Sequence, residues 1–292
     1  DLAPFVSRDS GYKYVLATLD QAAAALAAGG AAFPFTMHAG FAGFNTPATF
    51  ATFTQALKAR AAAYYATYGG GTAAWGTALT ALGSSFLNAG AATRAALDVG
   101  VYNVYAASPE VTNGDNLVTN TDLYAHPSIT ADANLKADGT LDNRYLAKVG
   151  ARPLRVAPAN TGAATSSVGF NIWATISTPV AILRNEELIL LRAEAKLATN
   201  DKAGAIADLN VVRTVSGGLP ASTLTAASTN DQILTGILYE KRYSLLMEAH
   251  RSEIFRYVLR SNNGPGMRFD FGRPLGGGNA GGDLSENGAN LP

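Results

Sequence analysis

Two stretches indicate the fold of this chain: Arg184-Asn-Glu-Glu-Leu-Ile-Leu-Leu-Arg-Ala-Glu-Ala195 and Ala205-Ile-Ala-Asp-Leu-Asn-Val-Val-Arg213. In both of them apolar side chains recur every three or four positions, as on one face of an amphipathic helix. Glycine pairs commonly end helices. The pattern therefore predicts helices over 180–198 and 203–214, with a turn at Asn200-Asp201 between them and a break at Gly217-Gly218.

A third charged stretch follows and reads Glu240-Lys-Arg-Tyr-Ser-Leu-Leu-Met-Glu-Ala-His-Arg251. The side chain of Thr229 or Asn230 can cap the helix that contains it, because a short polar side chain accepts a hydrogen bond from a free backbone N–H. We expect this helix to run to about residue 249. A short helix is expected over 251–260, and 261–292 is a tail rich in Gly and Asn.

The N-terminal part of the chain has the pattern of paired helices separated by glycine turns. Ser7 or Asp9 can cap a helix over 8–28, and Gly29-Gly30 can end it. Pro47 suits the first turn of a second helix, where its missing N–H costs nothing. The second helix carries Tyr64, Tyr65 and Tyr68 on one face, Gly69-Gly-Gly71 ends it, and a third helix is expected over 72–88.

The middle of the chain, residues 99–178, is dense in Asn, Asp, Thr, Gly and Pro and contains two β-type runs, 100–105 and 168–176. A structureless loop of this length is improbable in a compact domain, so we expect a loop-rich insertion with short strands. The predicted plan is helical hairpins over 1–98, this insertion as the candidate ligand region, C-terminal helices over 179–260 and the tail 261–292, all in one globular unit.

Composition excludes several classes of protein. The chain has 292 residues with a formal net charge of zero, so it lacks the basic surface that a nucleic-acid partner requires. It contains no cysteine, which removes disulfides and thiolate chemistry. The apolar run at Ala22–Ala32 is too short to span a membrane, because a spanning helix needs about 18 apolar residues or more.

The helical stretches resemble the C-terminal signature of the SusD/RagB family, nutrient-binding lipoproteins of the Gram-negative outer membrane. In that family R-x-x-E-x-x-L-x-R-A-E-A precedes A-x-x-x-L-N-x-x-R, and E-R-R-x-E-L-x-x-E-G-H-R follows. The signature positions that match here are Arg184, Glu187, Leu190, Arg192, Ala193, Glu194, Ala195, Ala205, Leu209, Asn210, Arg213, Glu240, Arg242, Leu245, Glu248, His250, Arg251 and Arg256, while Ser244, Ala249 and Ile254 depart from the pattern.

This resemblance implies a mostly α, tetratricopeptide-like helical-repeat scaffold and a non-catalytic role. Such a protein captures an oligosaccharide at the cell surface and passes it to a TonB-dependent, SusC-like transporter. The membrane contact would be made through an N-terminal lipid anchor that this chain does not contain. The chain is shorter than typical members, and we expect the signal, the anchor cysteine and the first helices to lie upstream of Asp1; the alternative is a reduced, unanchored relative of the family.

Some charged residues invite a catalytic interpretation. Glu187 and Glu194 are seven positions apart, which is about 10.5 Å along a helix, and with Glu186 they could serve as acid and base. Ion pairing between helices is the simpler interpretation. His250 has no second His nearby, so we assign it a structural role. No G-x-S-x-G motif is present, Asn113-Gly-Asp-Asn116 reads as a turn rather than a Ca²⁺ loop, and no cofactor or metal is predicted.

Aromatic residues in the loop-rich region are the candidates for ligand contact, since sugar rings pack on aromatic faces while their hydroxyls bind polar side chains. The candidates are Tyr102, Tyr105, Tyr124, Asn171 and Trp173. Two alternatives stay open. The ligand could be a peptide, or the chain could be a structural helical-repeat module that binds protein and no small ligand, with these aromatic side chains buried in its core.

Overall fold

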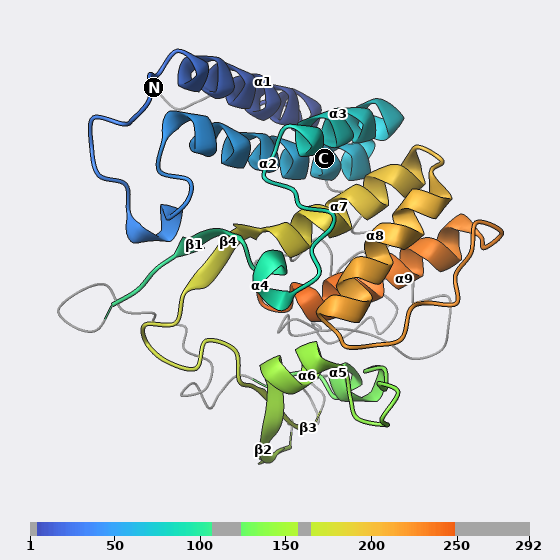
Figure 1. The fold of residues 1–292 in the computed structure, drawn as a ribbon. Coiled ribbons are helices and arrows are strands. Elements are labelled where there is room, and N and C mark those ends of the chain that lie inside the picture. Colours follow the sequence, from blue (N-terminus) through green and yellow to red (C-terminus); the bar gives the residue numbers. More distant parts are fainter. Residues whose placement is uncertain (1–4, 107–123, 157–164, 249–292) are drawn as a thin grey trace. The chain divides into compact units, whose positions relative to one another are not determined.

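The computed structural model describes residues 5–106, 124–156 and 165–248, and its elements are shown in Figure 1. By its internal contacts the chain divides into two compact units. The first contains residues 1–104, 179–216 and 221–244, and the second contains the remaining residues. The predicted helix 251–260, the tail, the Asn113–Asn116 turn, His250 and Arg251 lie outside the described residues.

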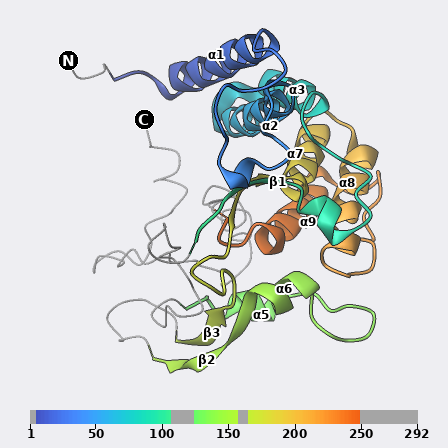
Figure 2. The ribbon, with the colours of Figure 1, turned by 60° about the vertical axis from the view of Figure 1, so that its left-hand side comes forward.

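Three helices at the N-terminus form consecutive antiparallel layers in the first unit (Figures 1 and 2). They are α1 (Arg8–Ala27), α2 (Pro47–Tyr65) and α3 (Gly71–Gly83), with a π-helical turn, η2 (Ala66–Gly70), between the last two. The hydroxyl of Ser7 caps α1 by accepting a hydrogen bond from the N–H of Ser10, at 3.1 Å. Thr46 and Thr49 form a capping box at the start of α2, which satisfies two free N–H groups there.

Small side chains let α2 and α3 approach closely. Ala56, Ala59 and Ala62 of α2 and Ala78 of α3 are fully buried between helices, where a larger side chain would not fit. The third helix ends at Gly83, five residues before the predicted end, and its C-cap Ser84 donates its N–H to the carbonyl of Ala81.

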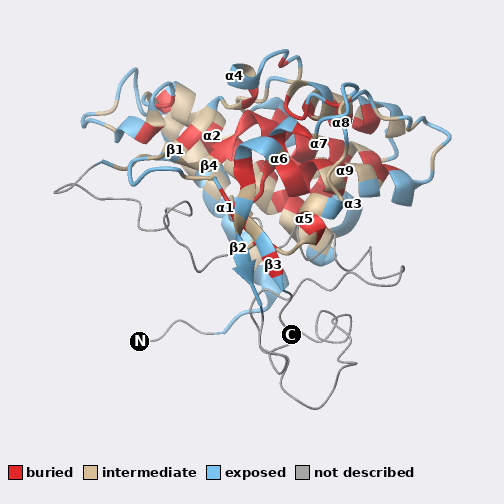
Figure 3. Ribbon diagram, turned by 90° about the horizontal axis from the view of Figure 1, so that it is seen from below, coloured by how far each residue is buried: buried red, intermediate tan, exposed pale blue. Residues whose placement is uncertain are grey.

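The C-terminal helices of the first unit are α7 (Asn185–Ala198), α8 (Lys202–Val215) and α9 (Asn230–Ser244). The middle one of the stack is α7, which packs against α2 and α3 on one side and against α8 and α9 on the other. It is buried nearly all round, as Figure 3 shows. Thr229 bonds the N–H of Gln232 and Gln232 bonds the N–H of Thr229, so α9 begins at the predicted cap.

One part of the prediction for this region is wrong. Residues 180–184 are not the first turn of a helix but a strand, β4 (Val180–Arg184), which pairs antiparallel with β1 (Gly100–Asn103). The apolar run Val180-Ala-Ile-Leu183 is too short to distinguish a strand from a helix without its partner. The 3₁₀ turn η1 (Ala39–Phe41) contacts β1, and the short helix α4 (Arg94–Leu97) precedes it.

The second unit holds two very short helices and a small sheet. The helices are α5 (Ser128–Ala131) and α6 (Asn143–Lys148), and β2 (Val149–Arg155) pairs antiparallel with β3 (Ser166–Phe170). The predicted strand over 168–176 therefore ends at Phe170, and Asn171 and Trp173 lie in the loop that follows. The chain as a whole is a mostly α, helical-repeat scaffold with a loop-rich insertion, which confirms the predicted fold class.

Candidate functional site

The carboxylates of α7 face neighbouring helices. Both oxygens of Glu187 accept hydrogen bonds from the guanidinium of Arg60 in α2, at 2.6 and 2.5 Å. Two turns further along α7, the carboxylate of Glu194 lies 3.0 Å from Nζ of Lys241 in α9. All of these carboxylate groups are buried, so each charge is compensated by a cation from another helix. These partners lie on other helices, far in sequence from the two carboxylates.

Glu186 is fully buried in a cluster that joins four segments. Its carboxylate accepts hydrogen bonds from Arg184 and from the hydroxyl of Ser244, the latter at 2.7 Å, and Arg94 lies 3.4 Å away. Burial alone raises the pKa of Glu186. The charges of Arg184 and Arg94 and hydrogen bonds from Ser216 and Ser244 outweigh that effect, and the pKa lies well below its ordinary value. This carboxylate is therefore held ionised and cannot act as a general acid.

The other signature residues also hold helices together. Arg192 binds Asp208 in a bidentate pair at 2.8 and 2.6 Å, which joins α7 to α8. Arg213 reaches Glu240 of α9 at 3.0 Å. Three more contacts complete the set: Asn210 accepts the N–H of Ser222, Arg242 lies over the ring of Tyr243, and Glu248 pairs with Lys148 in the second unit.

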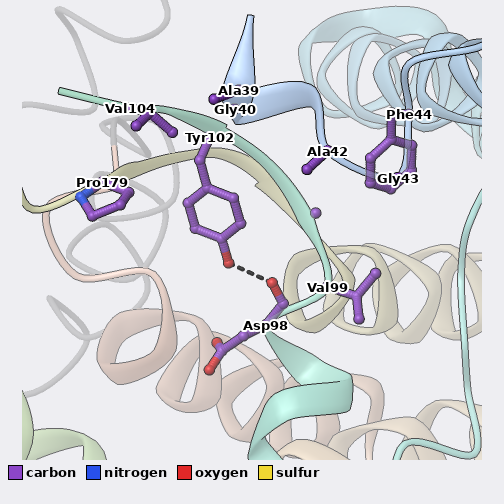
Figure 4. Close-up of a pocket in the computed structure, with 11 residues that line it drawn as sticks. Ala39, Gly40, Ala42, Gly43, Phe44, Asp98, Val99, Tyr102, Val104 and Pro179 are labelled. Carbon is purple, nitrogen blue, oxygen red and sulfur yellow. Dashed lines mark hydrogen bonds between the residues drawn. The ribbon is translucent and has the colours of Figure 1, made fainter. Parts of the chain in front are cut away.

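Tyr102 lines a pocket of about 500 Å³ in the first unit, in the volume range of small-molecule sites. The walls are mostly apolar and come from the turn at 39–44, from β1 and from Pro179 (Figure 4). The hydroxyl of Tyr102 donates to the backbone carbonyl of Asp98, which fixes the ring across the pocket. The carboxylate of Asp98 is bound to Arg94 at 2.8 Å and lies 3.3 Å from Arg184, so its negative charge is compensated.

Tyr124 is anchored on the small sheet of the second unit. Its hydroxyl donates to the carbonyl of Pro153 in β2 at 3.0 Å, and the guanidinium of Arg155 lies 5.6 Å from its ring centroid. The ring is half-buried and has one face stacked on a cation. Sequence reasoning did not single out Arg155, although an arginine near an aromatic residue is a frequent part of binding surfaces.

Asn171 and Trp173 lie in the loop after β3. The exposed amide of Asn171 donates to the carbonyl of Val149 at 3.4 Å, and its backbone N–H donates to the carbonyl of Lys148 at 2.9 Å. Trp173 is half-buried with φ at 55°. A bulky side chain rarely occupies this left-handed region, where it costs about 1 kcal/mol or more, and such strain is concentrated at functional sites.

The structure brings only part of the predicted set together. Tyr124 and Asn171 both bond to the backbone of β2, and Trp173 follows Asn171 by two residues. Tyr105, half-buried, begins the same unit. Tyr102 belongs to the first unit and its pocket is built there. In the part of the chain that the structure describes, no group of three His, Asp or Glu residues is placed to hold a metal ion, and no helix has the length and hydropathy needed to cross a bilayer.

Comparison with known proteins connects this arrangement to one family. Residues 172–266 match the model of the SusD family. A solved SusD-like protein from Bacteroides fragilis matches with a TM-score of 0.57 and 18% identity, over 90% of this chain and 62% of that chain. SusD superfamily proteins from Parabacteroides distasonis and Bacteroides vulgatus match with TM-scores of 0.49 and 0.48 and identities of 14% and 13%, over 72% of this chain in both cases.

This chain matches only part of each of the solved proteins. The chain spans 62%, 52% and 53% of the three solved proteins, so each of them is substantially longer. At 18% identity the likeness to the Bacteroides fragilis protein shows a shared fold, and function has to be argued from the site. No curated protein matches the chain.

Proposed function

Because residues 172–266 match the model of the SusD family, we propose that the chain captures an oligosaccharide at the surface of a Gram-negative cell and passes it to a TonB-dependent outer-membrane transporter. The observation that supports this proposal best is the strained loop of the second unit. It presents Trp173 two residues after the exposed amide of Asn171, next to the small sheet that anchors Tyr124.

The chemistry of this loop suits a sugar. The indole ring offers a flat apolar face for the C–H groups of a pyranose, and the amide of Asn171 can bind hydroxyls as donor and acceptor. Hydroxyls of Thr175, Ser177 and Thr178 lie in the same exposed loop, where Thr175 and Thr178 bond one another at 2.9 Å. This proposal needs no metal and no cofactor.

Nothing in the described residues favours hydrolysis. The carboxylates that a glycosidase would use in α7 are paired with Arg184, Arg60 and Lys241, and they face neighbouring helices. A glycosidase needs two carboxyl groups that face one cleft and hold different protonation states. We therefore propose a binding protein without catalytic activity.

The experiment that tests capture compares two variants. Trp173→Ala removes the proposed stacking face, while Leu154→Ala trims a more exposed apolar residue on β2. A panel of neutral oligosaccharides is titrated against the unmodified chain and both variants by isothermal calorimetry. We expect a binding oligosaccharide whose affinity falls about tenfold or more in Trp173→Ala, as stacking on one ring contributes about 1 kcal/mol or more, and stays unchanged in Leu154→Ala.

Two outcomes would redirect the proposal. Binding of peptides in place of sugars, with the same loss in Trp173→Ala, would assign the site to the peptide-binding alternative. Absence of binding to either panel would contradict capture and favour the structural helical-repeat module. Handover is tested separately by isolating the native protein from outer membranes, where a TonB-dependent barrel should be recovered with it.

A further inference from the structure

The α1–α2 hairpin carries a stack of tyrosines that nutrient capture does not use. The ring of Tyr12 stacks on Tyr65 with centroids 5.5 Å apart and on Tyr68 with centroids 6.5 Å apart. Tyr68 is 39% exposed, and Tyr14 in α1 is 73% exposed. Tyr12 lies near the start of α1, and Tyr65 and Tyr68 lie at the end of α2 and just after it, so the rings gather at one end of the hairpin.

An apolar groove of about 330 Å³ runs beside this stack. The guanidinium of Arg60 in its floor is already bound to Glu187 and to the carbonyl of Ile182. The groove therefore offers mainly hydrocarbon and ring surface, which cannot satisfy the hydroxyls of a sugar. Its lining residues are Tyr12, Val15, Leu19, Leu57, Arg60, Ala61 and Tyr64.

The side chains of α1 are exposed or partly exposed along its whole length. None of its 20 residues is buried, although α2 next to it buries seven. Val15, which lines the groove, is 43% exposed. An aromatic and aliphatic surface of this kind on a helical hairpin is typical of protein interaction sites.

One cation at the edge of this surface, Arg8, lies over an aromatic ring. The guanidinium of Arg8 lies 5.3 Å from the ring centroid of Tyr68. The nearby carboxylate of Asp9 is bound instead by Lys13, at 2.7 Å, and by the hydroxyl of Tyr65. Within residues 5–106, 124–156 and 165–248, no carboxylate lies in ion-pair range of Arg8. An arginine held over an aromatic ring, with its donors free, fits a carboxylate.

We propose that this tyrosine surface, made of Arg8, Tyr12, Tyr65, Tyr68 and the adjoining groove, binds a protein partner that inserts an aliphatic side chain into the groove and places a carboxylate on Arg8. Tyrosine and arginine are the residues that most often dominate binding energy at protein interfaces. A second copy of the chain is a poor occupant, because a two-fold pairing sets the same patch against itself and adds no carboxylate for Arg8.

The test uses the full protein in the cells that produce it. Val15→p-benzoylphenylalanine places a photo-activated cross-linker at the groove, and Thr80→p-benzoylphenylalanine places the same group on the exposed surface of α3 as a control. We expect position 15 to link to one other protein, and position 80 not to link to it. The linked peptide, read by mass spectrometry, should carry an acidic residue close to an aliphatic one.

Charge reversal makes the test specific. Arg8→Glu should lower the yield of the position-15 product about tenfold, because a hydrogen bond between charged groups contributes about 1.5 kcal/mol or more. Changing the acidic residue of the linked peptide to lysine should restore the yield. Loss of yield without restoration would contradict the proposed pairing.

Other outcomes would overturn the inference. A link only to another segment of the same polypeptide would mean that the surface is covered within the protein, and a link only to a second copy would make it a self-association surface. No link, or a link unaffected by Arg8→Glu, would also contradict it. The identity of the linked protein bears separately on the proposed function, since a partner that is no transporter keeps this inference and removes support for handover.

Discussion

At the scale of single residues, Glu186 carries the clearest energetic consequence. It is fully buried, and its charge is balanced by Arg184 and Arg94 and by the hydroxyl of Ser244. A buried carboxylate costs several kcal/mol to desolvate, so its presence is stabilising only while these partners are in place. The cluster thus makes the packing of α7 depend on a few polar contacts as well as on apolar burial.

We predict that Glu186→Gln lowers the free energy of unfolding by about 3 to 5 kcal/mol, because it leaves the arginines without their buried counter-charge. Chemical denaturation followed by circular dichroism measures this difference. Lys13→Ala is the matched control, since it breaks an ion pair that is exposed to solvent and should change stability little. A loss in Glu186→Gln no larger than in the control would show that the cluster does not stabilise the fold.

The same carboxylate sets a pH dependence. The pKa of Glu186 in the folded protein lies below its ordinary value of 4.5, so its stabilising contribution is complete above that value. It is lost as the pH falls below 4.5 towards the folded-state pKa. Between pH 5 and pH 3 we expect the unmodified chain to lose more stability than Glu186→Gln does, as measured by denaturation at each pH. Parallel losses in the two chains would contradict this assignment.

At the scale of elements, two glycines with opposite surroundings test how closely segments pack. A Cβ on Gly40 in η1 would lie 1.8 Å from the carbonyl oxygen of Tyr102 in β1, whereas nothing lies within 4 Å of a Cβ on Gly76 in α3. The turn η1 can therefore approach β1 only because residue 40 has no side chain. This approach also forms one wall of the pocket around Tyr102.

Gly40→Ala should separate η1 from β1 and lower the melting temperature, while Gly76→Ala should raise it. The second effect, about 0.5 to 1 kcal/mol, comes from the higher helix propensity of alanine in a site with open space. Differential scanning calorimetry on both variants checks the pair. If both substitutions shift the melting temperature in the same direction, the close contact between η1 and β1 is not present in solution.

At the scale of the whole molecule, the charge balance predicts its behaviour in solution. The net charge is zero and the isoelectric point is about 7.0, with only 15% charged residues. Mutual repulsion between copies is therefore weakest near neutral pH. Static light scattering of this chain at low ionic strength should show the greatest self-association near pH 7 and less at pH 9. A monotonic change across that range would contradict charge balance as the cause.

The sequence predicted those features that depend on local pattern. Apolar periodicity, caps and glycine stops located α1, α2, α7 and α8 to within a few residues, because each of these signals acts over one or two helical turns. The charged signature of α7 led to the family, and the family model matches the same region. Local pattern was insufficient at 180–184, since a run of four apolar residues and an arginine becomes a strand only when β1 is there to pair with it.

Residue patterns were enough to predict the helical class of this protein, its resemblance to the SusD family and the existence of a loop-rich insertion. The partners of the buried carboxylates in α7 could be identified only from the tertiary structure. Glu187 pairs with Arg60, which is 127 positions away, and Glu194 pairs with Lys241 rather than with a neighbour on its own helix. The strained backbone of Trp173 and the stacked tyrosines of the α1–α2 hairpin also became visible only there. The physical reason is that ion pairs, stacking and backbone strain depend on distances between segments, which a local pattern does not encode.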